Sequence, residues 1–104
     1  MDEAMSPNII VEISLSGPDA GGRSTSIASG EYRGILGVGD QHFSVRWFVP
    51  ISPLVPGGSS GVFGVQFLLP EAAMPFFPVG AIFSVWEGRP IGSGTVLQHV
   101  HPKP

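Results

Sequence analysis

Two of the five Lys and Arg residues in this chain lie in one Gly- and Ser-rich stretch, GGRSTSIASGEYR, residues 21–33. They are Arg23 and Arg33, and Arg23 directly follows a pair of glycines. A guanidinium group can bind a phosphate through two hydrogen bonds, and glycines let a backbone N–H approach the same ligand. The same residues also suit a hairpin turn with a solvent-exposed arginine. Arg33 could also form an ion pair on the protein surface instead of binding a phosphate. Three carboxylates are available for this: Glu31, Glu12 and Asp40.

Three other short segments contain residues typical of a nucleotide-binding loop, a metal site or a hydrolase active site. Each lacks a residue that such a site requires. The stretch PGGSSG, residues 56–61, lacks the Gly-Lys-Ser/Thr ending of a nucleotide-binding loop. His99 and His101 would share a strand face, but no third metal ligand is nearby. Asp40 and His42 are close in sequence, but there is no Gly-x-Ser-x-Gly elbow. We therefore expect no catalytic residue, metal, cofactor or nucleotide, and no enzyme activity.

Composition favours a folded domain with little attraction for polyanions. The chain has 104 residues, of which 42% are hydrophobic and 12% charged, unlike the composition of disordered proteins. A domain of this length can bury a core. The formal net charge is -3, so no overall positive field attracts nucleic acid. The absence of cysteine excludes disulfides and thiolate chemistry.

The start of the chain gives no sign of export. It reads MDEAMSPNIIVEISLSG and carries acidic residues where a secretory signal is basic. No apolar run approaches the roughly 18 residues that span a membrane. We therefore expect a cytoplasmic protein without a membrane partner.

The positions of glycine and proline, together with alternating apolar residues, predict an all-β fold. The longest stretch without either residue is 40–49, shorter than an average helix of about 11 residues. In IIVEISLS, the apolar side chains share one face of an extended chain and the polar ones the other. The sequence predicts strands over residues 9–16, 32–38, 42–49, 62–69, 81–87 and 94–100.

Six short strands separated by turns indicate a single domain, either a small antiparallel barrel or a sandwich. A barrel is favoured because closure removes exposed strand edges. We therefore expect a six-stranded antiparallel β-barrel over residues 9–100. Residues 1–8 and 101–104 would be tails.

Two strings at opposite ends of the chain carry motifs in a specific order. VEISLSGPDAGGRSTSIASGEYR, residues 11–33, has a strand, an acidic turn, Gly-Gly-Arg and then Tyr-Arg. FSVWEGRPIGSGTVL, residues 83–97, has a strand, Glu-Gly-Arg and then Gly-x-Gly. Together they resemble the third, C-terminal domain of translation elongation factor Tu. The resemblance covers residues 10–98 and implies a six-stranded antiparallel barrel.

This resemblance implies a non-catalytic binding module. In that family the barrel helps hold the T stem of aminoacyl-tRNA, contacts the exchange factor Ts and packs against a GTPase domain. Arg23, Ser24, Glu87 and Gly88 fall where the family touches the tRNA backbone, and Arg89 is the neighbouring cation. Most of the family's basic residues on this face have no counterpart here, so tRNA is expected to bind only weakly.

The segment MPFFPVG, residues 74–80, predicts an apolar docking patch. Phe76 and Phe77 are adjacent, so in an extended chain their side chains point to opposite faces and only one enters the core. Pro75 and Pro78 remove N–H donors and favour a rigid edge or loop. The outer ring would then contact a partner. In the alternative, both rings pack back onto one end of the barrel.

Two functions follow from these observations. The first is a binding module that engages a translation-related protein or RNA. The second is a structural or interaction subunit that has lost RNA contact and acts as a self-associating or regulatory protein. The net charge of -3 favours a protein partner over RNA in both cases.

Overall fold

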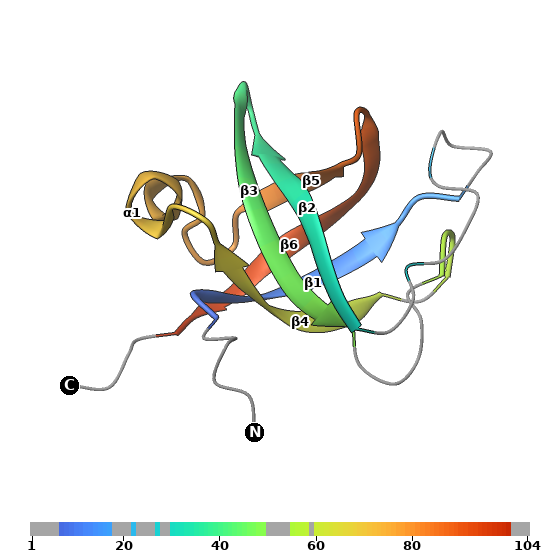
Figure 1. The fold of residues 1–104 in the computed structure, drawn as a ribbon, viewed down its shortest axis with the longest axis horizontal. Helices are drawn as coiled ribbons and strands as arrows, with labels where there is room; N and C mark the ends of the chain where they lie inside the picture. Colours follow the sequence, from blue (N-terminus) through green and yellow to red (C-terminus); the bar gives the residue numbers. More distant parts are fainter. Residues whose placement is uncertain are drawn as a thin grey trace.

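The alternating apolar residues form a closed antiparallel β-barrel (Figure 1). The computed structural model describes residues 7–17, 22, 27, 30–49, 55–58 and 60–100. The strands in these ranges are β1 (Ile9–Leu15), β2 (Gly30–Val38), β3 (Gln41–Val49), β4 (Gly61–Phe67), β5 (Ile82–Trp86) and β6 (Pro90–His99). Their order around the barrel is β1-β4-β3-β2-β5-β6, and every neighbouring pair is antiparallel. The prediction of a six-stranded antiparallel barrel is confirmed.

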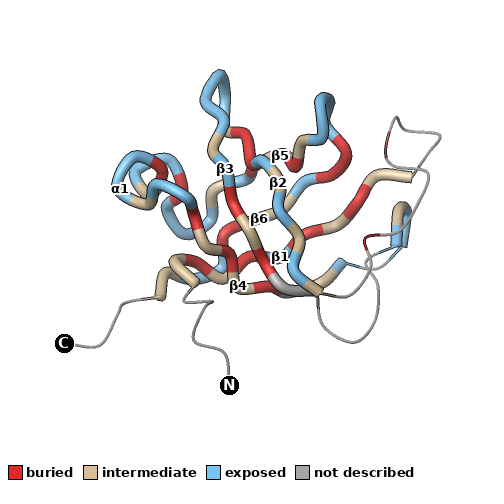
Figure 2. The backbone as a smooth tube through the Cα atoms, in the orientation of Figure 1, coloured by how far each residue is buried: buried red, intermediate tan, exposed pale blue. Residues whose placement is uncertain are grey.

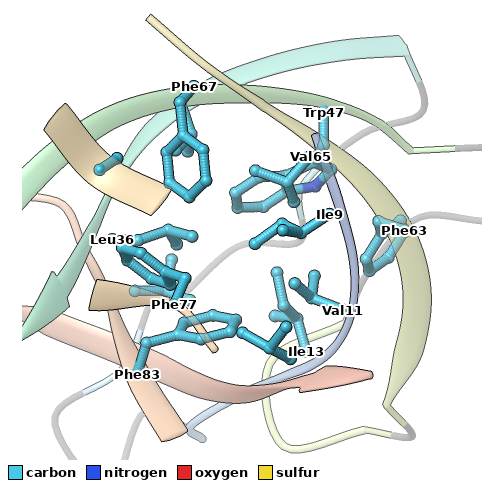
Figure 3. Close-up of a cluster of buried hydrophobic side chains, with 14 of the residues drawn as sticks. Ile9, Val11, Ile13, Leu36, Trp47, Phe63, Val65, Phe67, Phe77 and Phe83 are labelled. Carbon is cyan, nitrogen blue, oxygen red and sulfur yellow. The ribbon is translucent and has the colours of Figure 1, made fainter. Parts of the chain in front are cut away.

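Inward-facing residues of the strands fill the interior. In β1 the four apolar side chains at alternate positions are each 3% exposed or less, and Figure 2 shows the same alternation along other strands. The largest fully buried side chains are Trp47 and Phe77. Figure 3 shows these two rings, Phe67 and Phe83 around the aliphatic side chains of β1. Because side chains fill the interior of this small barrel, a binding surface must lie on its outside.

A two-residue turn sets the register of the β2–β3 hairpin. Gly39 has a φ of 57°, and no other described residue of this turn has a positive φ, as in a type II′ turn. Val38 therefore pairs with Gln41, and the pairing continues along the whole of β2. This long hairpin crosses in front of β1 and β6 in Figure 1.

A short helical segment lies between β4 and β5, where the sequence predicted strand and loop. β4 ends at Phe67, and the chain enters α1 (Pro70–Ala73) and then the 3-10 helix η2 (Met74–Phe76). Proline is well suited to the first turn because its fixed φ matches the helix and its missing N–H has no partner there. Among the described residues, no helix has the length and apolar character needed to cross a membrane.

The last strand begins at Pro90, four residues earlier than predicted. Its first half contains glycines because it lies very close to β1. A Cβ atom on Gly92 would lie 2.5 Å from the carbonyl oxygen of Ser14, and one on Gly94 would lie 2.4 Å from that of Glu12. Glycine at these positions lets the two strands pair from Ile13 to Leu15.

Candidate binding surface

The two motifs from opposite ends of the chain meet at the β5–β6 turn. Arg89 donates a hydrogen bond from Nη2 to the carbonyl oxygen of Gly22, at 3.0 Å. Gly88 adopts a φ of 75°, which favours glycine, and the N–H of Glu87 donates to the carbonyl of Arg89 across the turn. The turn is thus held against the start of the Gly-Gly-Arg segment. Two predicted contact residues, Arg23 and Ser24, lie outside the described residues.

Tyr32 connects β2 to the same turn. Its hydroxyl donates a hydrogen bond to the carboxylate of Glu87. Its ring packs on the buried Trp47, with the ring centroids 4.8 Å apart. The Tyr-Arg and Glu-Gly-Arg motifs are therefore neighbours in the fold, although they are far apart in the sequence.

On the outer face, the hairpin register places two arginines directly opposite each other. Arg33 of β2 pairs with Arg46 of β3. The Oε2 atom of Glu31 lies 2.8 Å from Nε of Arg33 and 3.6 Å from Nη1 of Arg46. The hydrogen bond from Arg33, aided by the charge of both arginines, holds the pKa of the Glu31 carboxyl below its ordinary value. Of the three carboxylates expected to compete for Arg33, Glu31 is the one it contacts.

Arg46 is also bonded to the next strand. Its Nε donates a hydrogen bond to Oε1 of Gln66 in β4, at 2.6 Å. This contact follows from the register, because Arg46 and Gln66 are direct partners in the β3–β4 ladder. A polar row therefore runs from β2 through β3 to β4.

A groove of about 870 Å³ crosses this outer face. Its lining includes the polar row of Arg33, Arg46 and Gln66. Apolar side chains from the end of β5 and from the entry to α1 also line it, namely Trp86, Leu68 and Pro70. Arg46, Gln66 and Trp86 were not among the predicted site residues. The pairing of Arg46 with Arg33 could have been predicted from the two-residue turn, because the turn fixes which residues pair across the hairpin.

The adjacent residues Phe76 and Phe77 differ in burial. Phe77 is fully buried, with its ring 4.8 Å from that of Phe67, so it is a core residue rather than a docking residue. Phe76 remains 40% exposed, and its ring lies 5.3 Å from that of Phe43. The segment turns through η2 instead of being extended, so helical geometry, not strand alternation, separates the rings. Only Phe76 remains a candidate for partner docking.

The histidines considered for metal binding and catalysis make contacts within the fold. Nε2 of His99 lies 2.7 Å from the carbonyl oxygen of Phe77, while His101 lies outside the described residues. The ring of His42 packs edge-on against Trp86, with the centroids 4.7 Å apart. In the part of the chain that the structure describes, no three His, Asp or Glu residues are grouped to hold a metal ion.

Comparison with models of protein families finds no family that matches this chain, and comparison with curated proteins finds no relative. A functional assignment therefore depends on the groove, on the β5–β6 turn and on the motifs in the sequence.

Proposed function

We propose that this barrel is a non-catalytic binding module that engages a protein partner. The observation that carries the proposal is the groove over β2, β3 and β4. Its volume of about 870 Å³ falls in the range of sites that hold a ligand or a peptide segment. Trp86 and the two arginines in its lining are of the residue types that dominate binding energy at protein interfaces.

Exposed leucines extend the apolar part of the groove toward α1. Leu68 is 72% exposed and Leu69 is 67% exposed, although they follow β4, whose last residue, Phe67, is buried. Burying one such side chain at an interface contributes roughly 1.5–3 kcal/mol. The groove and these leucines together make a surface with an apolar end and a charged centre.

The charges on this surface favour protein over RNA. Arg33 and Arg46 share the carboxylate of Glu31, and Arg89 is bonded to a backbone carbonyl. A phosphate backbone is bound by several cations acting together, and the chain carries a net charge of -3. Transfer RNA is therefore the weaker candidate.

The sequence resemblance supports a partner from the translation machinery. The residues that carry it lie in two strings far apart in the chain, and the contact of Arg89 with Gly22 brings their turns together. The class of partner in this proposal depends on that resemblance. The proposal of a binding module depends on the groove.

Self-association is a second candidate, favoured by apolar side chains outside the groove. Ile82 of β5 is 74% exposed, Val79 before it is 60% exposed, and Leu97 of β6 is 43% exposed. Such side chains on neighbouring segments suit contact between two copies of the chain. This candidate corresponds to a structural or regulatory subunit.

Affinity capture with the intact chain tests the proposal. The tagged protein is incubated with lysate of the cells that make it, with and without ribonuclease. We expect a discrete protein to be retained in both samples. Retention that is lost with ribonuclease, or no retained protein, would overturn the proposal. Sedimentation velocity of the purified chain tests the second candidate, which requires a dimer or larger species.

A further inference from the structure

We propose that the Arg33–Arg46 pair binds a carboxylate of the partner protein and that Glu31 occupies this site as an internal competitor. This inference rests on the proposed function and names the chemical group that the groove recognises. The two arginines would favour ligand binding, and Glu31 would oppose it.

Two like charges are paired directly on the outer face of the β2–β3 hairpin. Arg33 and Arg46 are partners in the β2–β3 ladder, and like charges in that position destabilise a sheet. The Arg33 side chain is 78% exposed and that of Arg46 is 29% exposed, so packing does not require an arginine at position 33. Local arrangements that oppose stability in this way are typical of functional sites.

Glu31 places its carboxylate between the two arginines. A single oxygen, Oε2, approaches both guanidinium groups, at 2.8 Å and 3.6 Å. The bond to Arg33 uses Nε, and the Arg33 side chain lines the groove and is 78% exposed, so the guanidinium group is accessible to an incoming ligand. The lowered pKa of Glu31 is consistent with a site that stabilises a carboxylate. The exposed ion pair of Glu31 with Arg33 is weak, so an incoming carboxylate can displace Glu31 from Arg33.

Apolar side chains line the groove beside the arginines. Ile35 and Trp86 are partners in the β2–β5 ladder, and both line the groove. Leu68 lines it on the side of α1 and is 72% exposed. An occupant therefore combines one carboxylate with apolar groups before and after it. An extended peptide with an acidic residue between apolar residues has this pattern.

A phosphate backbone fits the same surface less well. Glu87 also lines the groove, and together with Glu31 it balances the charge of the two arginines. A run of phosphates is repelled by both carboxylates, whereas a single acidic side chain needs only the arginine pair. The proposal therefore commits to an acidic segment of a protein.

A peptide array tests this inference with the intact folded chain. The probe is a set of nine-residue peptides with a central Glu and flanking positions drawn from Leu, Val, Phe and Ser. A matched set has Gln at the centre. We expect stronger retention of the protein on the Glu set and competition by free Glu peptides. Equal retention on both sets, or no retention on either, would overturn the inference.

Three variants and one control assign the effect to the arginine pair. For the best Glu peptides we expect Arg33→Gln and Arg46→Gln each to weaken binding about 3-fold, in line with exposed ion pairs. Glu31→Gln should strengthen it by a similar factor. Glu12→Gln is the control, because it removes the same charge from β1, where Glu12 bonds Ser60 outside the groove. Melting curves establish that all four variants are folded.

The outcomes separate this inference from the proposed function. If Glu31→Gln and Glu12→Gln change binding equally, the effect is one of net charge and the inference is wrong. If an RNA hairpin competes for the site better than the Glu peptides, the ligand is phosphate and the inference is also wrong. A lysate partner that is still captured by the Arg33→Gln, Arg46→Gln double variant would leave the proposed function in place without this site.

Discussion

The hydroxyl of Tyr32 donates a hydrogen bond to the carboxylate of Glu87, a residue 55 positions further along the chain. The bond lies beyond the end of the β2–β5 ladder, which pairs Ile35 to Gly37 with Trp86 to Ser84. Side chains thus continue the contact between β2 and the β5–β6 turn after the backbone pairing has stopped. Both residues also line the groove, so their bond fixes one end of the proposed binding surface.

Replacing Tyr32 with Phe tests that bond. The ring keeps its contact with Trp47 while the hydrogen bond to Glu87 is lost, and we expect the unfolding free energy to fall by about 1 kcal/mol. Chemical denaturation measures the change. Glu87→Gln provides the second arm of a double-mutant cycle, in which the two effects should be non-additive. Fully additive effects would show that the two side chains do not interact in solution.

The acid titration of Glu31 tests the arginine pair in the unliganded protein. The hydrogen bond from Arg33 is the largest cause that lowers the pKa of Glu31 below its ordinary value of 4.5. Because the folded-state value lies below the unfolded-state value, the ion pair contributes stability above pH 4.5. That contribution is lost as the pH falls through the folded-state pKa. Carbon-13 NMR of the Glu31 carboxyl should show the lowered pKa, and Arg33→Gln should raise it. An unchanged pKa in that variant would contradict the contact.

The adjacent phenylalanines should respond differently to truncation. Phe77 is fully buried among aromatic rings, so Phe77→Ala should lower the unfolding free energy by about 3–5 kcal/mol. Phe76 is 40% exposed, so Phe76→Ser should cost about 1 kcal/mol and weaken only binding that uses this patch. Thermal unfolding compares the two variants. Equal losses of stability would show that both rings belong to the core.

RNA binding should be weak and only modestly dependent on salt. The candidate phosphate contacts are Arg23 and Arg89, and Arg89 already bonds the carbonyl of Gly22. Two phosphate contacts predict a loss of about 10-fold in affinity between about 50 and 200 mM salt. Fluorescence anisotropy with a T-stem RNA hairpin measures this loss. Binding that survives the Arg23→Ala, Arg89→Ala double substitution would show that RNA uses another surface.

Much of the barrel could be predicted because alternation and turn residues are local signals. The β1 pattern of apolar residues and the turn at Gly39 specify a face and a register without tertiary information. The first four residues of β6, 90–93, were missed because Pro90 and Gly92 are typical of turns and interrupt the alternation of side chains. The helix at Pro70 was missed because four residues are too few to show a helical period.

The candidate site was less predictable because it is assembled by strand neighbours. The contact of Arg33 with Glu31 is within one strand and was among the expected pairs. The pairing with Arg46 depends on the hairpin register, and the approach of Trp86 depends on barrel closure. The separation of Phe76 from Phe77 was expected, but from strand geometry that the 3-10 helix replaces.

The most direct test of the proposed function is site-specific photo-cross-linking in the cells that make the protein. A benzophenone amino acid is placed at Ile35, which lines the groove and is 37% exposed. The control position is Val62, which faces outward from β4, is 58% exposed and is not part of the groove lining. A binding module that uses the groove predicts a discrete, ribonuclease-resistant protein adduct at position 35 and none at position 62. Equal adducts at both positions, adducts with RNA, or no adduct at position 35 would contradict it.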